Sequence, residues 1–282
     1  THATHIDKRI HAVRGDALNG WHTTKRSVRP VNKTEWPGVV SPVKTAKSLI
    51  NAGETSHEHL ARHPHYRPAG VGTTAAMVIE ASKAGALGSL PAAALSLAQL
   101  REALVTVREA SPRPINVNFF CHQPPAPDAA RDRHWKDLLE PYYRELGADF
   151  QAPTPVSNRE PFNEAACQFI EELRPEVVSF HFGLPEKALL DQVKATGAKV
   201  LSSATTVEEA IWLEQHGCDA IIAMGSEAGG HRGLFLSDDL NTQIGLFALL
   251  PQVVDAVSVP VISAGGIGDA RGIVAAFALG AS

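Results

Sequence analysis

A glycine-rich segment carries the side chains of this sequence that are best suited to chemistry. The stretch "AIIAMGSEAGGHRG", residues 220–233, begins as an apolar strand and then places Glu227, His231 and Arg232 among glycines. Glycines let the backbone pass close to a ligand, and a histidine on such a loop titrates near neutral pH. His231 is therefore predicted to take a proton from carbon or to hold a developing anion. A solvated surface loop is the alternative.

A second glycine-rich segment follows the last apolar strand of the sequence. In "VPVISAGGIGDARG" this strand leads to Gly265 and Gly266, and Asp269 is placed to cap the next helix. Backbone N–H groups that no side chain shields, at the positive end of a helix dipole, form a binding site for phosphate. The alternative is a turn whose glycines serve only close packing of strand and helix.

Two further polar residues lie near predicted strand ends. His181, in "SFHFGLP", is as consistent with a core histidine as with a ligand contact. Asn118, in "NVNFF", has a side chain that can donate and accept hydrogen bonds, which suits a heterocycle with alternating donors and acceptors. A structural amide is the alternative for Asn118.

Four histidines, His57, His59, His63 and His65, lie close together in "HEHLARHPH". Histidine clusters can bind metal ions. Nothing in the surrounding sequence indicates the packed groups that would orient such ligands, so we expect no metal site here. The sequence also contains no GxSxG nucleophile motif.

The elements that must position these residues alternate between strands and helices from about residue 73 onward. Strands are predicted in "ALGSL", "PINVNFF", "EVVSFHF", "AKVLSSA", "DAIIAMG" and "VPVISAGG", with helical stretches between most of them. Strands that are apolar on both faces and separated by helices belong to a parallel sheet. The pattern alone allows a doubly wound sheet or a barrel.

The positions of the polar residues favour the barrel. Residues at or just past strand ends include Asn118, His181, Ser203, Gly225 and Gly265. A (β/α)₈ barrel builds its active site at this C-terminal face, whereas a dinucleotide-binding sheet would show GxGxxG after its first strand, and that spacing is absent.

Composition divides the chain into two parts. Residues 1–70 hold 11 basic against 5 acidic residues and 8 of the 13 histidines, so we expect a basic, poorly ordered segment. Residues 71–282 are predicted to form the barrel, and their 15 basic against 25 acidic residues argue against a nucleic-acid groove.

With no apolar run long enough to cross a membrane and no signal peptide, a cytoplasmic location is expected. The cysteines form no CxxC pair, which predicts free thiols.

Five segments together resemble the flavin-dependent nitronate monooxygenases, also called 2-nitropropane dioxygenases, which are FMN-binding TIM barrels. The segments are "VIEASKAGALGSLPAA", "INVNFFCHQPP", "VVSFHFGLP", "GSEAGGHRG" and "VPVISAGGIGDARGIVAAFALGA", in the family's order over roughly residues 72–282. The resemblance implies oxidation of a nitronate by O₂ to a carbonyl compound and nitrite. It implies FMN as the cofactor, and a small-molecule nitronate and O₂ as the partners, with no nucleic acid or membrane.

The resemblance also implies roles for individual residues. His231 is similar to the family's catalytic base or substrate-orienting histidine, and His181 to a motif residue near the substrate. Implied flavin contacts are Asn118, Ser203, Met224, Gly229, Gly230, Gly265 and Gly266, with Met224 standing where many members have a glutamine.

The sequence departs from the family pattern at both ends of the barrel. The usual first strand, of the type "PIIQAPMAG", is replaced by "HPHYRPAGVG", and the sequence stops at "LGAS" before an eighth strand. We therefore expect a barrel that lacks its first and last strands. Two alternatives to the nitronate monooxygenase function are an enzyme similar to the flavin-dependent enoyl-thioester (enoyl-ACP) reductases and a truncated, non-catalytic barrel remnant.

Overall fold

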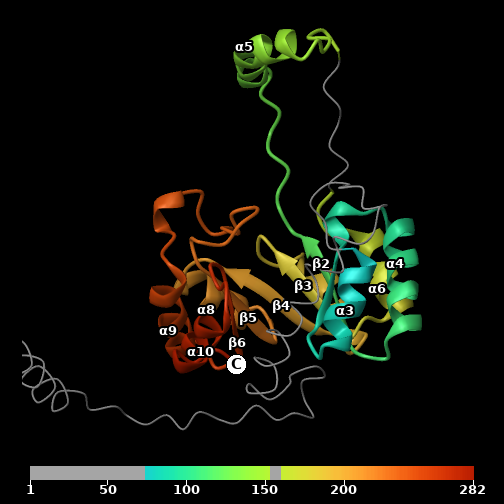
Figure 1. The fold of residues 1–282 in the computed structure, drawn as a ribbon, viewed down its shortest axis with the longest axis vertical. Helices are drawn as coiled ribbons and strands as arrows, with labels where there is room; N and C mark the ends of the chain where they lie inside the picture. The colour runs from blue at the N-terminus through green and yellow to red at the C-terminus, as the bar shows by residue number, and fades with distance from the viewer. Residues whose placement is uncertain (1–73, 153–159) are drawn as a thin grey trace, which may run out of the picture. The chain divides into compact units, whose positions relative to one another are not determined.

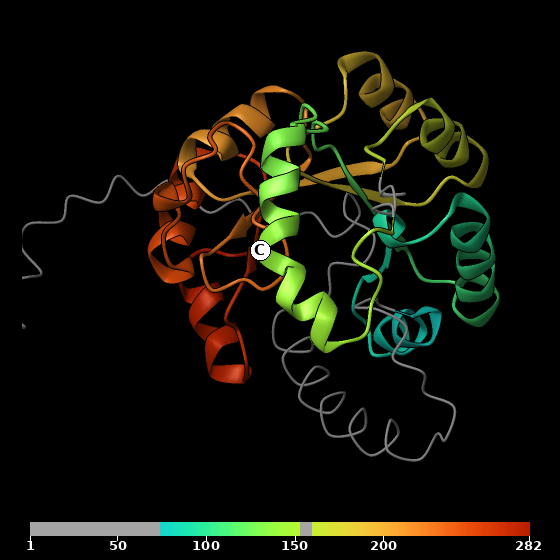
Figure 2. The ribbon, with the colours of Figure 1, turned by 90° about the horizontal axis from the view of Figure 1, so that it is seen from above.

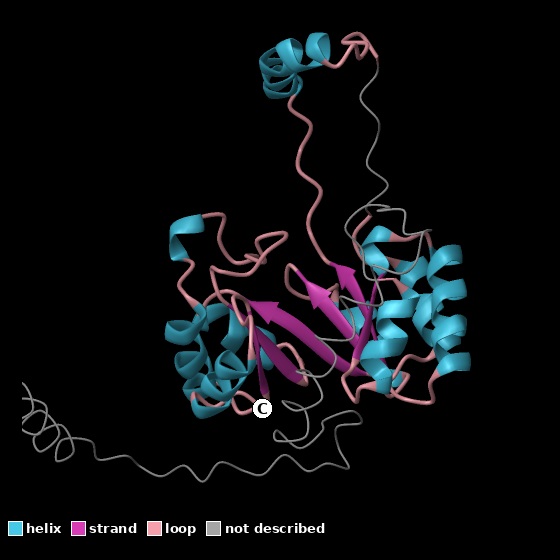
Figure 3. Cartoon of the chain, in the orientation of Figure 1, coloured by secondary structure: helices cyan, strands magenta, loops and turns pink. Residues whose placement is uncertain are grey.

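A computed structural model describes residues 74–152 and 160–282 of this chain. The predicted N-terminal segment, residues 1–70 with its four-histidine cluster, lies outside the described residues. Within them, six strands form one sheet, and all point the same way (Figure 3). The strands are β1 (Gly88–Pro91), β2 (Ile115–Phe120), β3 (Val177–His181), β4 (Lys199–Ala204), β5 (Ala220–Met224) and β6 (Val261–Ala264). Each strand predicted from the sequence is confirmed.

The order of the strands identifies the architecture. Each strand pairs in parallel with its neighbour in sequence, in the order β1-β2-β3-β4-β5-β6 (Figure 1). A doubly wound sheet reverses its strand order at a switch point, whereas a (β/α)₈ barrel adds its strands one after another. The barrel prediction is therefore confirmed. The described residues form a six-stranded part of such a barrel, with β1 and β6 as its edges.

Helices connect the strands, and apart from α5 they lie around the outside of the curved sheet (Figure 2). The α-helices of the described residues are α3 (Ala75–Lys83), α4 (Leu97–Ala110), α5 (Ala129–Glu145), α6 (Glu164–Leu173), α7 (Lys187–Ala195), α8 (Val207–Gln215), α9 (Leu246–Ala256) and α10 (Ala270–Ala278). Two short 3₁₀ turns are η1 (Ala92–Ala94) and η2 (Leu240–Thr242). None of the described helices has both the length and the apolar character required to cross a bilayer.

Side-chain caps fix several helix starts, and the predicted cap at Asp269 is one of them. Thr74 accepts a hydrogen bond from the N–H of Met77 at the start of α3, and Asp269 accepts one from the N–H of Arg271 at the start of α10. The long connection between β2 and β3 contains α5 and α6. Helix α5 buries none of its side chains.

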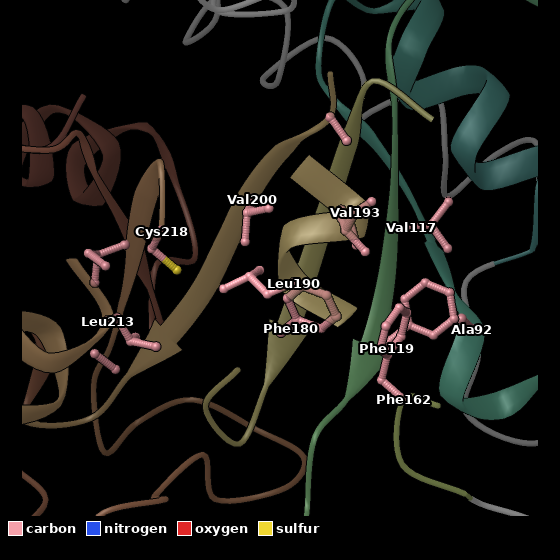
Figure 4. Close-up of a cluster of buried hydrophobic side chains, with 14 of the residues drawn as sticks. Ala92, Val117, Phe119, Phe162, Phe180, Leu190, Val193, Val200, Leu213 and Cys218 are labelled. Atoms are coloured by element: carbon pink, nitrogen blue, oxygen red, sulfur yellow. The ribbon is translucent and has the colours of Figure 1, made fainter. Parts of the chain in front are cut away.

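The outer face of the sheet packs against the helices and forms the main core. The rings of Phe119, Phe162 and Phe180, labelled in Figure 4, pack together in this core. Ring centroids are 5.0 Å apart for Phe119 and Phe162 and 5.2 Å apart for Phe162 and Phe180. Val200 of β4 and Leu213 of α8 belong to the same buried cluster. Burial of each such side chain contributes about 1.5–3 kcal/mol. Because strand side chains alternate between faces, this packing turns the other set, with the polar residues, toward the barrel interior.

The three cysteines are free thiols, as predicted. Burial raises the pKa of Cys121 above its ordinary value and raises the pKa of Cys218 to about 12. Both thiols therefore stay protonated at neutral pH, and neither serves as a thiolate nucleophile.

Candidate functional site

A chain of hydrogen bonds crosses the interior face of the sheet and orients Asn118. The amide nitrogen of Asn116 donates to Ser179 Oγ (2.8 Å), which in turn donates to Asn118 Oδ1 (2.8 Å). Asn116 and Ser179 are buried, and Asn118 lies two residues before the end of β2. The Nδ2 donor of Asn118 has no acceptor among the described residues, so it is available to a ligand. The side-chain oxygen of Asn118 is thus fixed by Ser179, while its nitrogen can still donate a hydrogen bond.

Both ring nitrogens of His181, the last residue of β3, are in hydrogen bonds. Nδ1 lies 2.7 Å from Ser203 Oγ, and Nε2 lies 3.3 Å from the backbone oxygen of His231. A carbonyl oxygen can only accept, so Nε2 carries the hydrogen and Nδ1 accepts from the serine hydroxyl. His181 therefore links β4 to the loop that follows β5.

Burial lowers the pKa of His181 below its ordinary value, against a smaller raising effect of the bond to His231. The imidazole is consequently neutral at neutral pH. A histidine whose folded pKa is lowered contributes stability that is present above its unfolded pKa and is lost as pH falls through the folded pKa. His181 is suited to hold the loop as a neutral donor, and not to carry a positive charge.

The turn after His181 is conformationally demanding. Phe182 has a φ of 68°, in the left-handed region that side chains other than glycine rarely adopt, and Gly183 follows with a φ of 85°. The buried hydroxyl of Ser202 donates to the carbonyl of Gly183 (2.8 Å) and fixes this turn. Such strain persists where the surrounding structure holds it, and it accumulates at functional sites.

Aromatic rings surround the two histidines predicted to be functional. The Phe120 ring lies 5.3 Å from the His231 ring and 5.6 Å from the His181 ring, between centroids. Phe182 is 4.4 Å from His181 and 6.1 Å from His231, and His122 stands edge-on to both phenylalanines. His231 itself is exposed. The result is an apolar wall on which His231 is exposed and His122 and His181 are half-buried.

The loop that carries His231 folds back onto the ends of the strands. Arg232 closes the loop through its guanidinium, which donates to the carbonyls of Ser226 (2.8 Å) and Ala228 (3.3 Å). The next residue, Gly233, is buried, and a Cβ built there would lie 2.8 Å from His181 Cε1. The sequence thus needs glycine at this position because the backbone passes directly over a ring.

Gly233→Ala is expected to displace the loop from His181 and to destabilise the fold by about 1–3 kcal/mol, because the added methyl group overpacks the contact. The added methyl group would meet His181 Cε1 at 2.8 Å and Ser203 Oγ at 3.3 Å. Gly229→Ala is the matched control, because a Cβ at Gly229 has no neighbour within 4 Å. Urea unfolding of the two variants and the wild type measures the difference. Equal urea midpoints for the two variants would show that the packing of Gly233 against His181 leaves room for a methyl group.

The glycine turn after β6 lies against the same loop. Gly265 and Gly266 have φ values of 114° and 67°, and Cβ atoms there would lie 2.9 Å from the nitrogen of Ala228 and 3.0 Å from Glu227 Cβ. The Glu227 carboxylate also accepts a hydrogen bond from the N–H of Leu246, at the start of α9 (2.8 Å). The loops after β5 and β6 are therefore packed together at one end of the sheet.

Unused donors lie at the start of α10. The N–H groups of residues 266–268 have no hydrogen-bond acceptor among the described residues. Asp269 caps the helix and pairs with Arg271, whose guanidinium lowers the pKa of Asp269 to about 2. Free N–H groups beside a helix N-terminus are the donor set that a phosphate requires.

The structure brings most of the predicted residues to one place. Those that surround Gly233 or contact one another through hydrogen bonds are His181, Ser203, Met224 and His231. Gly229 and Gly230 lie on the open part of the same loop, with nothing within 4 Å of a built Cβ. Asn118 is positioned separately, through Ser179.

Several residues in and next to the site were not predicted from the sequence, among them Phe120, Phe182 and Glu209, whose carboxylate accepts a hydrogen bond from the N–H of Phe235. Phe120 and Phe182 read as ordinary apolar strand and turn residues, and no local pattern signals the left-handed backbone of Phe182. Glu209 reads as an acid in the first turn of a helix, within the pattern Thr-x-x-Glu that is typical of a capping box. Its complete burial is the feature that this pattern does not reveal.

Proteins of similar sequence match about three quarters of this chain. The chain is 41% identical over 215 residues to a nitronate monooxygenase of Paraburkholderia phytofirmans and 40% identical over 215 residues to one of Pseudomonas aeruginosa. These matches cover 74% of this chain but only 57% and 60% of the relatives. The chain thus spans less than two thirds of the length of these relatives.

Solved structures show the same fold. A nitroalkane oxidase from Streptomyces ansochromogenes is 32% identical, with a TM-score of 0.68 over 76% of this chain and 60% of that one. FabK from Thermotoga maritima is 28% identical, with a TM-score of 0.54 over 77% of this chain and 54% of that one. The family model described as nitronate monooxygenase matches residues 60–282. The chain therefore belongs to the nitronate monooxygenase family.

Proposed function

We propose that this chain carries the cofactor- and substrate-binding face of an FMN-dependent nitronate monooxygenase, which oxidises nitronates with O₂ to a carbonyl compound and nitrite. The observation that carries the proposal is the position of His231, exposed on an aromatic wall and held by its backbone on the neutral His181. The nitronate monooxygenases at about 40% identity support it.

FMN fits the donors that the described residues offer. Its phosphate would be held by the free N–H groups of residues 266–268 at the start of α10, beside the positive-φ Gly265 and Gly266. The free Nδ2 donor of Asn118 suits an acceptor atom of the flavin ring. When bound, FMN supplies the transfer of electrons between substrate and O₂.

His231 would handle the proton. Its exposed imidazole can accept the proton from the α-carbon of a neutral nitroalkane and leave the anionic nitronate. The resulting imidazolium would then stabilise the negative nitro group. The rings of Phe120 and Phe182 would cover one side of the imidazole with apolar surface and strengthen this interaction.

The test is O₂ consumption by the purified chain mixed with FMN and propyl nitronate, without NAD(P)H. Uptake of O₂ with release of nitrite is the expected result, together with a bound-flavin absorption spectrum. Turnover only with NAD(P)H and an enoyl thioester would instead support the enoyl-thioester reductase alternative. Absence of a bound-flavin spectrum would support the non-catalytic remnant.

A further inference from the structure

The carboxylate of Glu209 is almost completely withdrawn from solvent, with 1% of the residue exposed. It lies in the first turn of α8 and accepts hydrogen bonds from two sides. Oε2 accepts from the N–H (2.7 Å) and the hydroxyl (2.8 Å) of Thr205, and Oε1 accepts from the N–H groups of Phe235 (2.8 Å) and Leu236 (3.4 Å). A buried carboxylate is tolerated only when its oxygens are satisfied in this way.

The second pair of donors belongs to the segment in which the His231 loop ends. Phe235 lies two residues after Gly233, which rests on His181, and four residues after His231 itself. The Phe235 ring also contacts the position where Gly183 turns the chain, at 3.1 Å from a built Cβ. The carboxylate therefore holds the last part of the loop, at Phe235 and Leu236, to the N-terminal turn of α8.

Helix α8 carries a similar carboxylate at its other end. Glu214 accepts hydrogen bonds from the N–H groups of Ser258 (2.6 Å) and Val259 (3.2 Å), just before β6. Glu214 is half-buried and lies at the N-terminal side of the strands, far along the helix from the His231 loop. The two glutamates thus make the same kind of clamp, and only that of Glu209 bears on the site.

We propose that Glu209 is a positioning residue for His231. By clamping the N–H groups of Phe235 and Leu236, it keeps Gly233 on His181, and with it the backbone oxygen of His231 on His181 Nε2 and the His231 ring on Phe120. The consequence for catalysis rests on the function proposed above. The clamp itself is a structural property of the loop, and it can be tested without an assay of activity.

The rate of trypsin cleavage at the Arg232–Gly233 bond measures how often the loop leaves its position, in which Gly233 packs against His181. Arg232 is exposed, but Gly233 is buried and the Arg232 guanidinium is bonded to the carbonyls of Ser226 and Ala228, so we expect slow cleavage while the loop stays in this position. Glu209→Gln loses the charge and one acceptor oxygen. We expect it to raise the cleavage rate at this bond by about tenfold, measured by mass spectrometry of the peptides.

Glu214→Gln is the matched control, and its cleavage rate at Arg232 is expected to stay within about twofold of the wild type. Thr205→Val is the second variant, which removes one hydroxyl donor to the carboxylate and is expected to give an intermediate rate. Circular dichroism shows which variants are folded. A wild-type cleavage rate in folded Glu209→Gln overturns the clamp, and so does a wild-type rate in Thr205→Val if Glu209→Gln does not fold.

Kinetics separate the clamp from the proposed function. If both are right, Glu209→Gln lowers kcat for a neutral nitroalkane more than it raises KM, while Glu214→Gln changes neither. Faster cleavage in a chain whose wild type shows no turnover would support the clamp and contradict the proposed function. Faster cleavage with unchanged kcat would contradict the positioning role and leave the proposed function standing.

Discussion

His231→Asn is expected to lower turnover of a neutral nitroalkane by about 100-fold or more and to leave FMN binding nearly unchanged, since the variant lacks the group that takes the proton. The loop should stay in place, because the backbone oxygen and not the side chain of residue 231 bonds to His181. Preformed nitronate, which is already deprotonated, should lose less turnover. Steady-state O₂ consumption with the two substrates measures the contrast.

The control for this substitution is His216→Asn. His216 is also exposed, but it stacks on Trp212 at the far end of α8, with its ring nitrogen 2.7 Å from the Trp212 carbonyl. Its replacement should leave turnover within about twofold of the wild type. Equal losses on nitroalkane and nitronate in His231→Asn would reduce His231 to an orienting role, and an unchanged rate would remove it from the mechanism.

Gly266→Asp is expected to abolish FMN binding. It places a negative charge beside the free N–H groups of residues 266–268, where the dianionic phosphate is proposed to bind. Two charges about 4 Å apart repel by about 4 kcal/mol near a protein surface, although salt screens part of this. Fluorescence titration of FMN into both proteins measures the loss, and riboflavin, which has no phosphate, should be affected far less.

Gly266→Asn separates charge from shape. Residue 266 has a φ of 67°, and a Cβ there lies 3.0 Å from Glu227 Cβ, so any side chain disturbs the packing somewhat. Asn and Asp are similar in size and tolerate this backbone conformation better than most residues. We therefore expect the asparagine variant to bind FMN about 100-fold more tightly than the aspartate variant. If a folded Gly266→Asp protein keeps the wild-type preference for FMN over riboflavin, the phosphate does not bind at this turn.

The elements of the barrel and several of their ends are determined by local sequence. Apolar runs such as "AIIAM" favour strands because their side chains fit a sheet covered on both faces, and Asp269 caps α10 because its short carboxylate reaches the next free N–H groups. The placement of His181 and Gly265 at strand ends follows from the same patterns. These features depend on residues only a few positions apart, so the sequence alone predicts them.

Contacts between distant segments were decided only by the tertiary structure. The polar residues at strand ends favoured a barrel, but the strand order that establishes it is a matter of which strands pair, and the alternation of strands and helices is the same in a doubly wound sheet. The bond between His181 and His231 joins residues 50 positions apart, and the Glu209 clamp joins residues 26 positions apart. A glutamate near a helix start is usually exposed, and it is the path of the returning loop that buries this one. The sequence therefore names the reactive residues, while the folded loop determines which atoms they meet.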